Sequence, residues 1–208
     1  PTGIFRGFEN VGTDYGMIMA ILGGDDAGGG VLWAPQVIEE ARDHGLVLSE
    51  EGKLYDTRAG QSLPDGVGAM PLLTEAELAA FPEPTPAEVI PRFVARYNDL
   101  VALAKNAPAR VIGPDARLRD RPGFEVELLT RSSADGRERT PERHEVLMPL
   151  RGHWRFGWGN HAEFLAPGDT LAVPPGLAHS LAPSMSGEAA LYRVRATDDP
   201  AGPTMEAA

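Results

Sequence analysis

The sequence predicts a mainly β protein whose C-terminal half forms a jelly-roll barrel. The first observation behind this prediction is a series of short apolar, β-rich runs from residue 110 onward, separated by turns rich in glycine and proline. The second is the stretch 168–179, which sets a tight turn, a short strand, a second turn and a histidine at fixed offsets. Residues 33–108 have helical spacing instead, so we expect a helical connector before the barrel.

The start of the chain is predicted to contain a strand over 16–22, because this run is apolar and has the length of a strand. The glycine-rich stretch 23–30 follows it. A phosphate-binding loop would continue with Lys-Ser/Thr or with a dinucleotide pattern, and neither is present. We therefore interpret 23–30 as a connecting loop.

The connector is expected to open with a helix over 34–44. Pro35 suits the first turn of this helix, and Gly45 suits its end. Further along, Thr74 and Glu77 have the spacing of a capping box, which predicts a short helix up to residue 80.

One longer helix is predicted from 85–88 to about Lys105, with Pro91 either kinking it or marking its true start. Its apolar residues recur at helical spacing, so we assign them to packing and not to a cofactor site. These residues are Phe93, Tyr97, Leu100, Val101 and Ala104.

The barrel itself is predicted from a set of short strands within 109–197. The expected strands are residues 110–112, 124–130, 146–150, 154–158, 162–165, 170–173 and 189–195. Residues 132–140 are polar and are predicted to form a loop, and residues 198–208 are predicted to be a loosely held tail.

The stretch 168–179 resembles the second signature motif of the cupin family. Gly168, Pro174, Gly176 and His179 stand at the spacing of that motif, and only Pro183 departs from it, at a position where asparagine is usual. The resemblance implies a cupin jelly-roll, or double-stranded β-helix, barrel. It also implies that His179 faces the interior of this barrel.

The first cupin motif is only partly present. Glu145 fits its glutamate and Gly152 fits its final glycine, but Arg139 and Pro141 stand where two histidines are usual. In metal-binding cupins those two histidines, the glutamate and the later histidine hold one Fe, Mn, Ni or similar ion. By this resemblance Glu145 and His179 are the retained metal ligands and the candidate catalytic residues.

His144 is the candidate for a third metal ligand, because two protein ligands rarely hold a catalytic metal. Neighbouring side chains on a strand point to opposite faces, so His144 and Glu145 both face inward only if a β-bulge intervenes. Three aromatic residues alternate along the next strand and are predicted to face inward and stack on a substrate. They are Trp154, Phe156 and Trp158.

Residues 1–10 resemble the second cupin motif again, with Arg6 in place of the histidine. This resemblance implies a bicupin. Its domains would be 1–32 as the C-terminal part of a first barrel, 33–108 as the connector, 109–197 as the second barrel and 198–208 as the tail. Arg6 has no lone pair for a metal, so its candidate role is to bind a substrate carboxylate, with a surface or salt-bridged arginine as the alternative.

Composition excludes several classes of partner. The net charge of −11 and the pI near 4.9 argue against nucleic acid and against an anionic membrane surface. The chain has no cysteine, which excludes disulfides and thiolate catalysis and agrees with a cytoplasmic location. The longest apolar run, at 17–22, is too short to span a bilayer. We expect a homo-oligomer, such as a dimer, that acts on a small molecule.

The sequence leaves three functions open. The resemblance to bicupins implies a metal-dependent, dioxygenase-like oxidoreductase that uses Fe(II) or another divalent metal. The first alternative is a metal-free isomerase or cyclase in which Glu145 and His179 form an acid/base pair. The second alternative is a non-catalytic cupin that binds a ligand or dimerises. The cofactor therefore stays open between a divalent metal and none.

Overall fold

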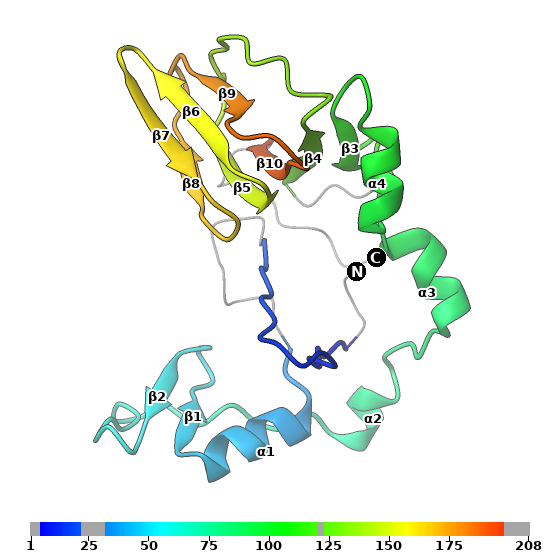
Figure 1. Ribbon diagram of the computed structural model, residues 1–208. Helices are drawn as coiled ribbons and strands as arrows, with labels where there is room; N and C mark the ends of the chain where they lie inside the picture. The colour runs from blue at the N-terminus through cyan, green and yellow to red at the C-terminus, as the bar shows by residue number, and fades with distance from the viewer. Residues whose placement is uncertain (1–4, 22–31, 120–122, 198–208) are drawn as a thin grey trace. The chain divides into compact units, whose positions relative to one another are not determined.

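The computed structural model describes residues 5–21, 32–119 and 123–197 (Figure 1). The chain forms two compact units, Pro1–Glu88 and Val89–Ala208. The predicted tail, 198–208, and the predicted glycine-rich loop, 23–30, lie outside the described residues. Within the described ranges, no helix is both long enough and apolar enough to cross a membrane.

The first unit contains the predicted opening helix, α1 (Pro35–Asp43), and it begins at the expected proline. Gly45 follows the helix with a φ of 80°, a conformation that favours glycine. A β-hairpin comes next, in which β1 (Leu46–Leu48) pairs antiparallel with β2 (Leu54–Asp56). The sequence analysis expected only helices and loops here, so the hairpin corrects it.

The predicted capping box opens α2 (Glu75–Leu78). The Thr74 hydroxyl accepts a hydrogen bond from the Glu77 backbone N–H at 3.3 Å, and the Glu77 carboxylate accepts one from the Thr74 backbone N–H at 2.8 Å. Two backbone N–H groups at the helix start are satisfied in this way, as the sequence spacing predicts.

The single long helix expected up to Lys105 is wrong. The chain instead forms α3 (Pro86–Phe93) and α4 (Tyr97–Leu103). Pro91 lies inside α3, where its ring removes one backbone hydrogen bond, and the helix ends two residues later. Arg96 has an extended backbone, with φ −83° and ψ 136°, and acts as the N-cap of α4.

Residues 5–21 form neither a helix nor a strand. The strand expected over 16–22 is therefore not formed at 16–21. A strand needs a partner strand for its backbone N–H and C=O groups, and no ladder in the described residues includes this stretch. A local turn is present, in which the Asn10 side-chain amide donates to the Asp14 carbonyl at 2.6 Å.

The second unit is built from two antiparallel sheets (Figure 1). One sheet has the strand order β3-β4-β10-β5-β8 and the other has the order β7-β6-β9. The strands are β3 (Ala109–Ile112), β4 (Phe124–Thr130), β5 (Glu145–Arg151), β6 (Trp154–Trp158), β7 (His161–Leu165), β8 (Leu171–Val173), β9 (Ser180–Pro183) and β10 (Ala190–Ala196). The seven strands predicted with bounds agree with β3 to β8 and with β10 within one residue at each end, whereas β9 was not among them.

The two sheets share one hydrophobic core, so they pack face to face. Both sheets contribute buried side chains to it, and the sequence period of two places these side chains on the inner faces. The core consists of Leu129, Leu147, Val173, Ala189 and Leu191 from or beside the five-stranded sheet, and Trp154, Phe156, Leu165 and Leu181 from the three-stranded sheet.

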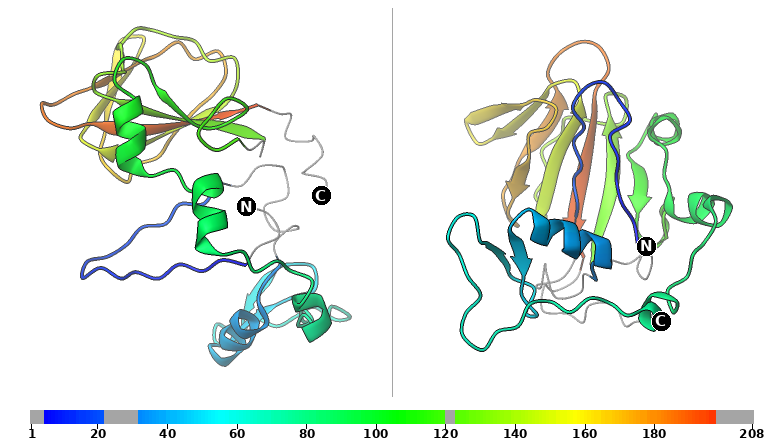
Figure 2. Two further views of the ribbon diagram at one scale, coloured as in Figure 1. Left: turned by 90° about the vertical axis from the view of Figure 1, so that its right-hand side faces the viewer. Right: turned by 90° about the horizontal axis from the view of Figure 1, so that it is seen from below.

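The opposite face of the five-stranded sheet packs against α4 (Figure 2). Leu100 and Ala104 of this helical segment are buried, and Leu128 of β4 is buried as well. The Thr130 hydroxyl donates a hydrogen bond to the Ala104 carbonyl at 2.5 Å. The sheet therefore has two different faces, one turned to the helix and one turned to the barrel interior.

The glycine that ends the first cupin-like motif is required by its conformation and surroundings. Gly152 turns the chain between β5 and β6 with a φ of 65°. A Cβ atom at this position would lie 2.5 Å from the Glu188 carbonyl oxygen. Any other residue would have to displace backbone, which explains why the motif places glycine here.

Candidate functional site

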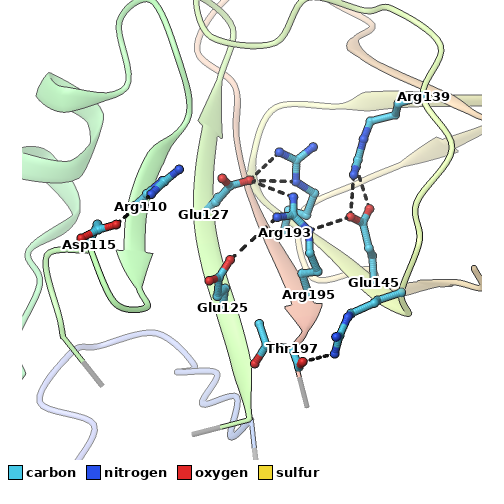
Figure 3. Close-up of polar contacts among 10 residues, drawn as sticks. Arg110, Asp115, Glu125, Glu127, Arg139, Glu145, Arg193, Arg195 and Thr197 are labelled. Carbon is cyan, nitrogen blue, oxygen red and sulfur yellow. Dashed lines mark hydrogen bonds and ion pairs between the residues drawn. The ribbon is translucent and has the colours of Figure 1, made fainter. Parts of the chain in front are cut away.

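The inner face of the five-stranded sheet is apolar at one end and charged at the other. Cross-strand registers set Glu125 and Glu127 of β4 beside Arg195 and Arg193 of β10, and Arg195 beside Glu145 of β5. Leu129, Leu191 and Leu147 continue the same face into the core. We call the charged part, with Arg139 from the preceding loop, the charged end; it comprises Glu125, Glu127, Arg139, Glu145, Arg193 and Arg195 (Figure 3).

Arg139 and Glu145 form the tightest pair of the charged end. The Arg139 Nη1 and Nη2 atoms lie 2.7 and 2.6 Å from the two carboxylate oxygens of Glu145, so the ion pair is bidentate. The Glu145 side chain is fully buried, whereas that of Arg139 is 32% exposed. The arginine therefore covers the carboxylate on the side that solvent can reach.

Arg195 links Glu145 to the glutamates of β4. Its Nε atom lies 3.3 Å from Glu145 Oε1, and its Nη2 atom lies 3.5 Å from Glu127 Oε2. Glu125 is more distant, with 3.8 Å between its Oε2 and Arg195 Nη1. Arg193 donates to Glu127 through both Nε, at 3.1 Å, and Nη2. Each charge in the network thus has a partner of the opposite sign.

The network fixes the ionisation of Glu145. Burial of the carboxyl group acts to raise its pKa, but hydrogen bonds and charge from Arg139, with smaller effects of Arg193 and Arg195, outweigh burial. Together they hold the pKa of Glu145 below its usual value. At neutral pH Glu145 is a carboxylate that accepts hydrogen bonds and has no proton to donate.

His179 lies next to this pair, because its backbone is bonded to that of Arg139. The Arg139 N–H donates to the His179 carbonyl at 2.8 Å, and the His179 N–H donates to the Arg139 carbonyl at 2.9 Å. The His179 ring is fully buried and stacks on Phe156, with 4.9 Å between ring centroids. Its Nδ1 atom is 3.0 Å from the Leu177 carbonyl oxygen.

The other ring nitrogen of His179 is the unusual feature. Nε2 is buried and has no hydrogen-bond partner within the described part of the protein. If Nδ1 carries the proton that it donates to Leu177, Nε2 presents a lone pair. A buried nitrogen of this kind can accept a hydrogen bond from a water molecule or from a ligand.

The residues that the cupin resemblance assigns to a metal do not form a donor set for one. In the described residues, no group of at least three His, Cys, Asp or Glu side chains is close enough together to hold a metal ion. Arg139 has no lone pair and carries a positive charge against Glu145. His144 is exposed, whereas its neighbour Glu145 is buried, as expected for a regular strand without a bulge. The metal role of His144 therefore receives no support from its position.

The aromatic residues predicted to bind substrate lie partly in the core. Trp154 and Phe156 are buried in the hydrophobic cluster, and Trp158 is half-buried at its edge. Trp158 stacks on His161 with 5.6 Å between centroids and approaches Phe156 at 5.5 Å. Trp158 is thus the most accessible of the three for contact with a ligand. Arg6 is exposed in the first unit, and its substrate role stays a prediction.

The sequence analysis missed most of the charged end. Arg193, Arg195, Glu125 and Glu127 alternate with apolar residues along two strands, and this period of two was the available signal. Arg139 was noticed only as the residue that replaces a ligand histidine. Its pairing with Glu145 depends on a loop that folds back across the strand, which local spacing does not predict.

Comparisons with known proteins give matches among solved structures. No protein-family model matches the chain, and no curated protein matches it. A cupin-2 domain protein from Shewanella frigidimarina is 14% identical, with 50% of this chain and 95% of that chain covered and a TM-score of 0.40. A protein from Neisseria meningitidis is 16% identical, with 50% and 99% covered and a TM-score of 0.40. A cupin 2 domain protein from Halorhodospira halophila is 21% identical, with 44% and 63% covered and a TM-score of 0.38. The chain is thus similar to cupin, or double-stranded β-helix, structures over about half of its length.

Proposed function

We propose that the second unit is a metal-independent cupin barrel that binds a small molecule carrying an anionic group. The observation that carries the proposal is the charged end inside an otherwise apolar barrel. Charged side chains are costly to bury unless they are paired. Here they are paired with one another, and the side chains of Arg139 and Arg195 keep about a third of their surface exposed.

The sign of the ligand's charge follows from which charged side chains remain accessible to solvent. Glu145 is fully buried, whereas the side chains of its partners Arg139 and Arg195 are each about one third exposed, so a molecule that approaches this carboxylate meets an arginine first. A guanidinium has five N–H donors, and the contact with Glu145 occupies Nη1 and Nη2 on one side only. The remaining donors suit a carboxylate or phosphate group.

His179 favours a second candidate function, a metal-free isomerase or cyclase. Its Nε2 lone pair could accept a proton from a bound molecule, provided that the molecule reaches this buried atom. Glu145 is not the matching acid, because its lowered pKa keeps it ionised at neutral pH. In this candidate, His179 is the base and Arg139 binds the anionic group.

The metal-dependent oxidoreductase that the cupin resemblance implies would need a donor set other than that of this barrel, since Arg139 replaces a ligand and His144 is exposed. The bicupin arrangement, the homo-oligomeric state and the cytoplasmic location stay proposals. Intact mass and size-exclusion chromatography of the native protein test the first two.

Ligand binding is tested by thermal shift and calorimetry with a panel of small carboxylates and phosphates in chelator-treated buffer. We expect a saturable shift with a member of this panel that survives EDTA and is lost in Arg139→Gln. Arg137→Gln is the matched control, because Arg137 is 85% exposed and pairs only with Asp135 at 4.0 Å. A ligand effect that requires added metal, or that persists in Arg139→Gln, would contradict the proposal.

A further inference from the structure

We infer that the Arg139 guanidinium takes the place of a divalent cation in this barrel, so that a single substitution at residue 139 converts the site into a metal site. The inference concerns which cation neutralises Glu145. It holds whether or not the anionic ligand proposed above is correct, because its test measures metal alone.

The position of residue 139 is fixed by backbone pairing and not by its charge. Arg139 and His179 exchange two backbone hydrogen bonds, at 2.8 and 2.9 Å. In an antiparallel pair of this kind, the two residues lie directly opposite and their side chains project to the same face, with Cβ atoms about 5.5 Å apart. A shorter side chain at 139 would therefore project beside His179, and the backbone would not need to move.

The two residues that contact residue 139 each carry a potential metal donor. Glu145 reaches the side chain of residue 139 with both carboxylate oxygens, at 2.6 and 2.7 Å from the guanidinium nitrogens. His179 holds Nδ1 against the Leu177 carbonyl and leaves Nε2 buried and unpartnered. A histidine held through one nitrogen by a carbonyl presents its other nitrogen in the manner of a metal ligand. What is missing is a third donor, and residue 139 is the position that contacts Glu145 through its side chain and pairs with His179 through its backbone.

Arg139 also explains why an ion does not fit with the present residues. It offers no lone pair, its charge repels a divalent cation, and it occupies both oxygens of Glu145. Replacing it by histidine removes the nearest positive charge, leaves Glu145 with Arg195 as its one donor at 3.3 Å in the described residues, and supplies a nitrogen ligand. The resulting two nitrogens and one carboxylate form a set that binds divalent transition metals.

The experiment is a Co²⁺ titration of the full chain, followed by visible absorption and calorimetry. We expect the wild-type protein to bind no Co²⁺ through His179, and Arg139→His to bind one Co²⁺ per chain. Adding His179→Ala to Arg139→His should weaken this binding by about 100-fold or more, since a ligand is lost. Arg137→His is the control and should gain nothing, because Arg137 is exposed and remote from Glu145 in the hydrogen-bond network.

Arg139→Cys provides a second route should the histidine variant fail to fold. The chain contains no other cysteine, so cobalt–thiolate absorption would report on position 139 alone. The inference is overturned by a folded Arg139→His or Arg139→Cys protein, judged by circular dichroism, that binds Co²⁺ no better than Arg137→His. It is also overturned by stoichiometric Co²⁺ binding to the wild-type protein that His179→Ala abolishes.

Discussion

The two ends of the barrel interior lie on the same strands, but one end buries apolar side chains and the other buries paired charges. At one end, Leu129, Leu147 and Leu191 bury apolar surface with Trp154 and Phe156. At the other, β4, β5 and β10 continue with glutamates and arginines that neutralise one another (Figure 3). Only one residue of β10, Tyr192, separates Leu191 from Arg193.

The difference shows which part of the barrel is needed for folding. The apolar end stabilises through the hydrophobic effect, which needs no special geometry. The charged end gains little net stability, because desolvation of each ion offsets much of the attraction within a pair. The binding role proposed above would account for charges kept in such a place. The predictions below test the division between the two ends in order of decreasing effect.

Trp154→Ala should produce the largest loss of stability. Trp154 is fully buried in the cluster, and its removal should lower the free energy of unfolding by about 3–5 kcal/mol. Urea unfolding followed by circular dichroism measures the change. Phe164→Ala on the neighbouring strand is the control, since Phe164 is exposed, and it should change stability by less than about 0.5 kcal/mol. Equal effects of the two variants would place Trp154 outside the core.

Arg139→Met should destabilise less, by about 2 kcal/mol, because it leaves the buried Glu145 carboxylate with Arg195 as its remaining hydrogen-bond donor. The double variant Arg139→Met with Glu145→Gln removes both charges and should recover part of the loss. A double-mutant cycle built from urea unfolding curves gives the coupling energy. Strictly additive effects would show that the pair is not coupled.

Acid should act on the charged end through Glu145. The folded-state pKa of Glu145 is lowered, so its contribution to stability is complete above the unfolded-state pKa, about 4.3. The contribution is lost as the pH falls from there through the lower folded-state pKa. We expect the free energy of unfolding of Glu145→Gln to fall less steeply with decreasing pH than that of the wild-type protein. Unfolding curves between neutral pH and the acid limb measure this, and an unchanged slope would contradict it.

The sequence predicted the apolar end better than the charged end, for physical reasons. Alternation of apolar residues along β4 and β6 is a local signal that sets both strand and face, and the continuous apolar run of β5 marks a strand by its length. Turn residues such as Gly152 and Gly168 reinforced it, because both have a positive φ. Seven of the eight strands of the second unit were therefore predictable from spacing, and β9 was the exception.

The remaining features depend on contacts that sequence spacing does not encode. The pairing of Arg139 with Glu145 requires the 132–140 loop to reach back to His179 across 40 positions of the chain. The hairpin of β1 and β2 was missed because each strand has only three residues. The break between α3 and α4 was missed because Pro91, the expected kink, precedes it by several residues.

The smallest effect is expected at the outer edge of the charged end. Glu125 lies 3.8 Å from Arg195 and its side chain is 36% exposed, so solvent screens most of the attraction. Glu125→Gln should change the free energy of unfolding by less than about 0.5 kcal/mol, because exposed ion pairs contribute little. Urea unfolding compares it with Glu145→Gln, which removes a charge from a fully buried carboxylate with several donors. If the division between the two ends is right, the effect of removing a charge increases with burial, from Glu125 inward to Glu145. An equal or larger effect at Glu125 would mean that the network stabilises the barrel as a unit, and the charges would then need no ligand to explain them.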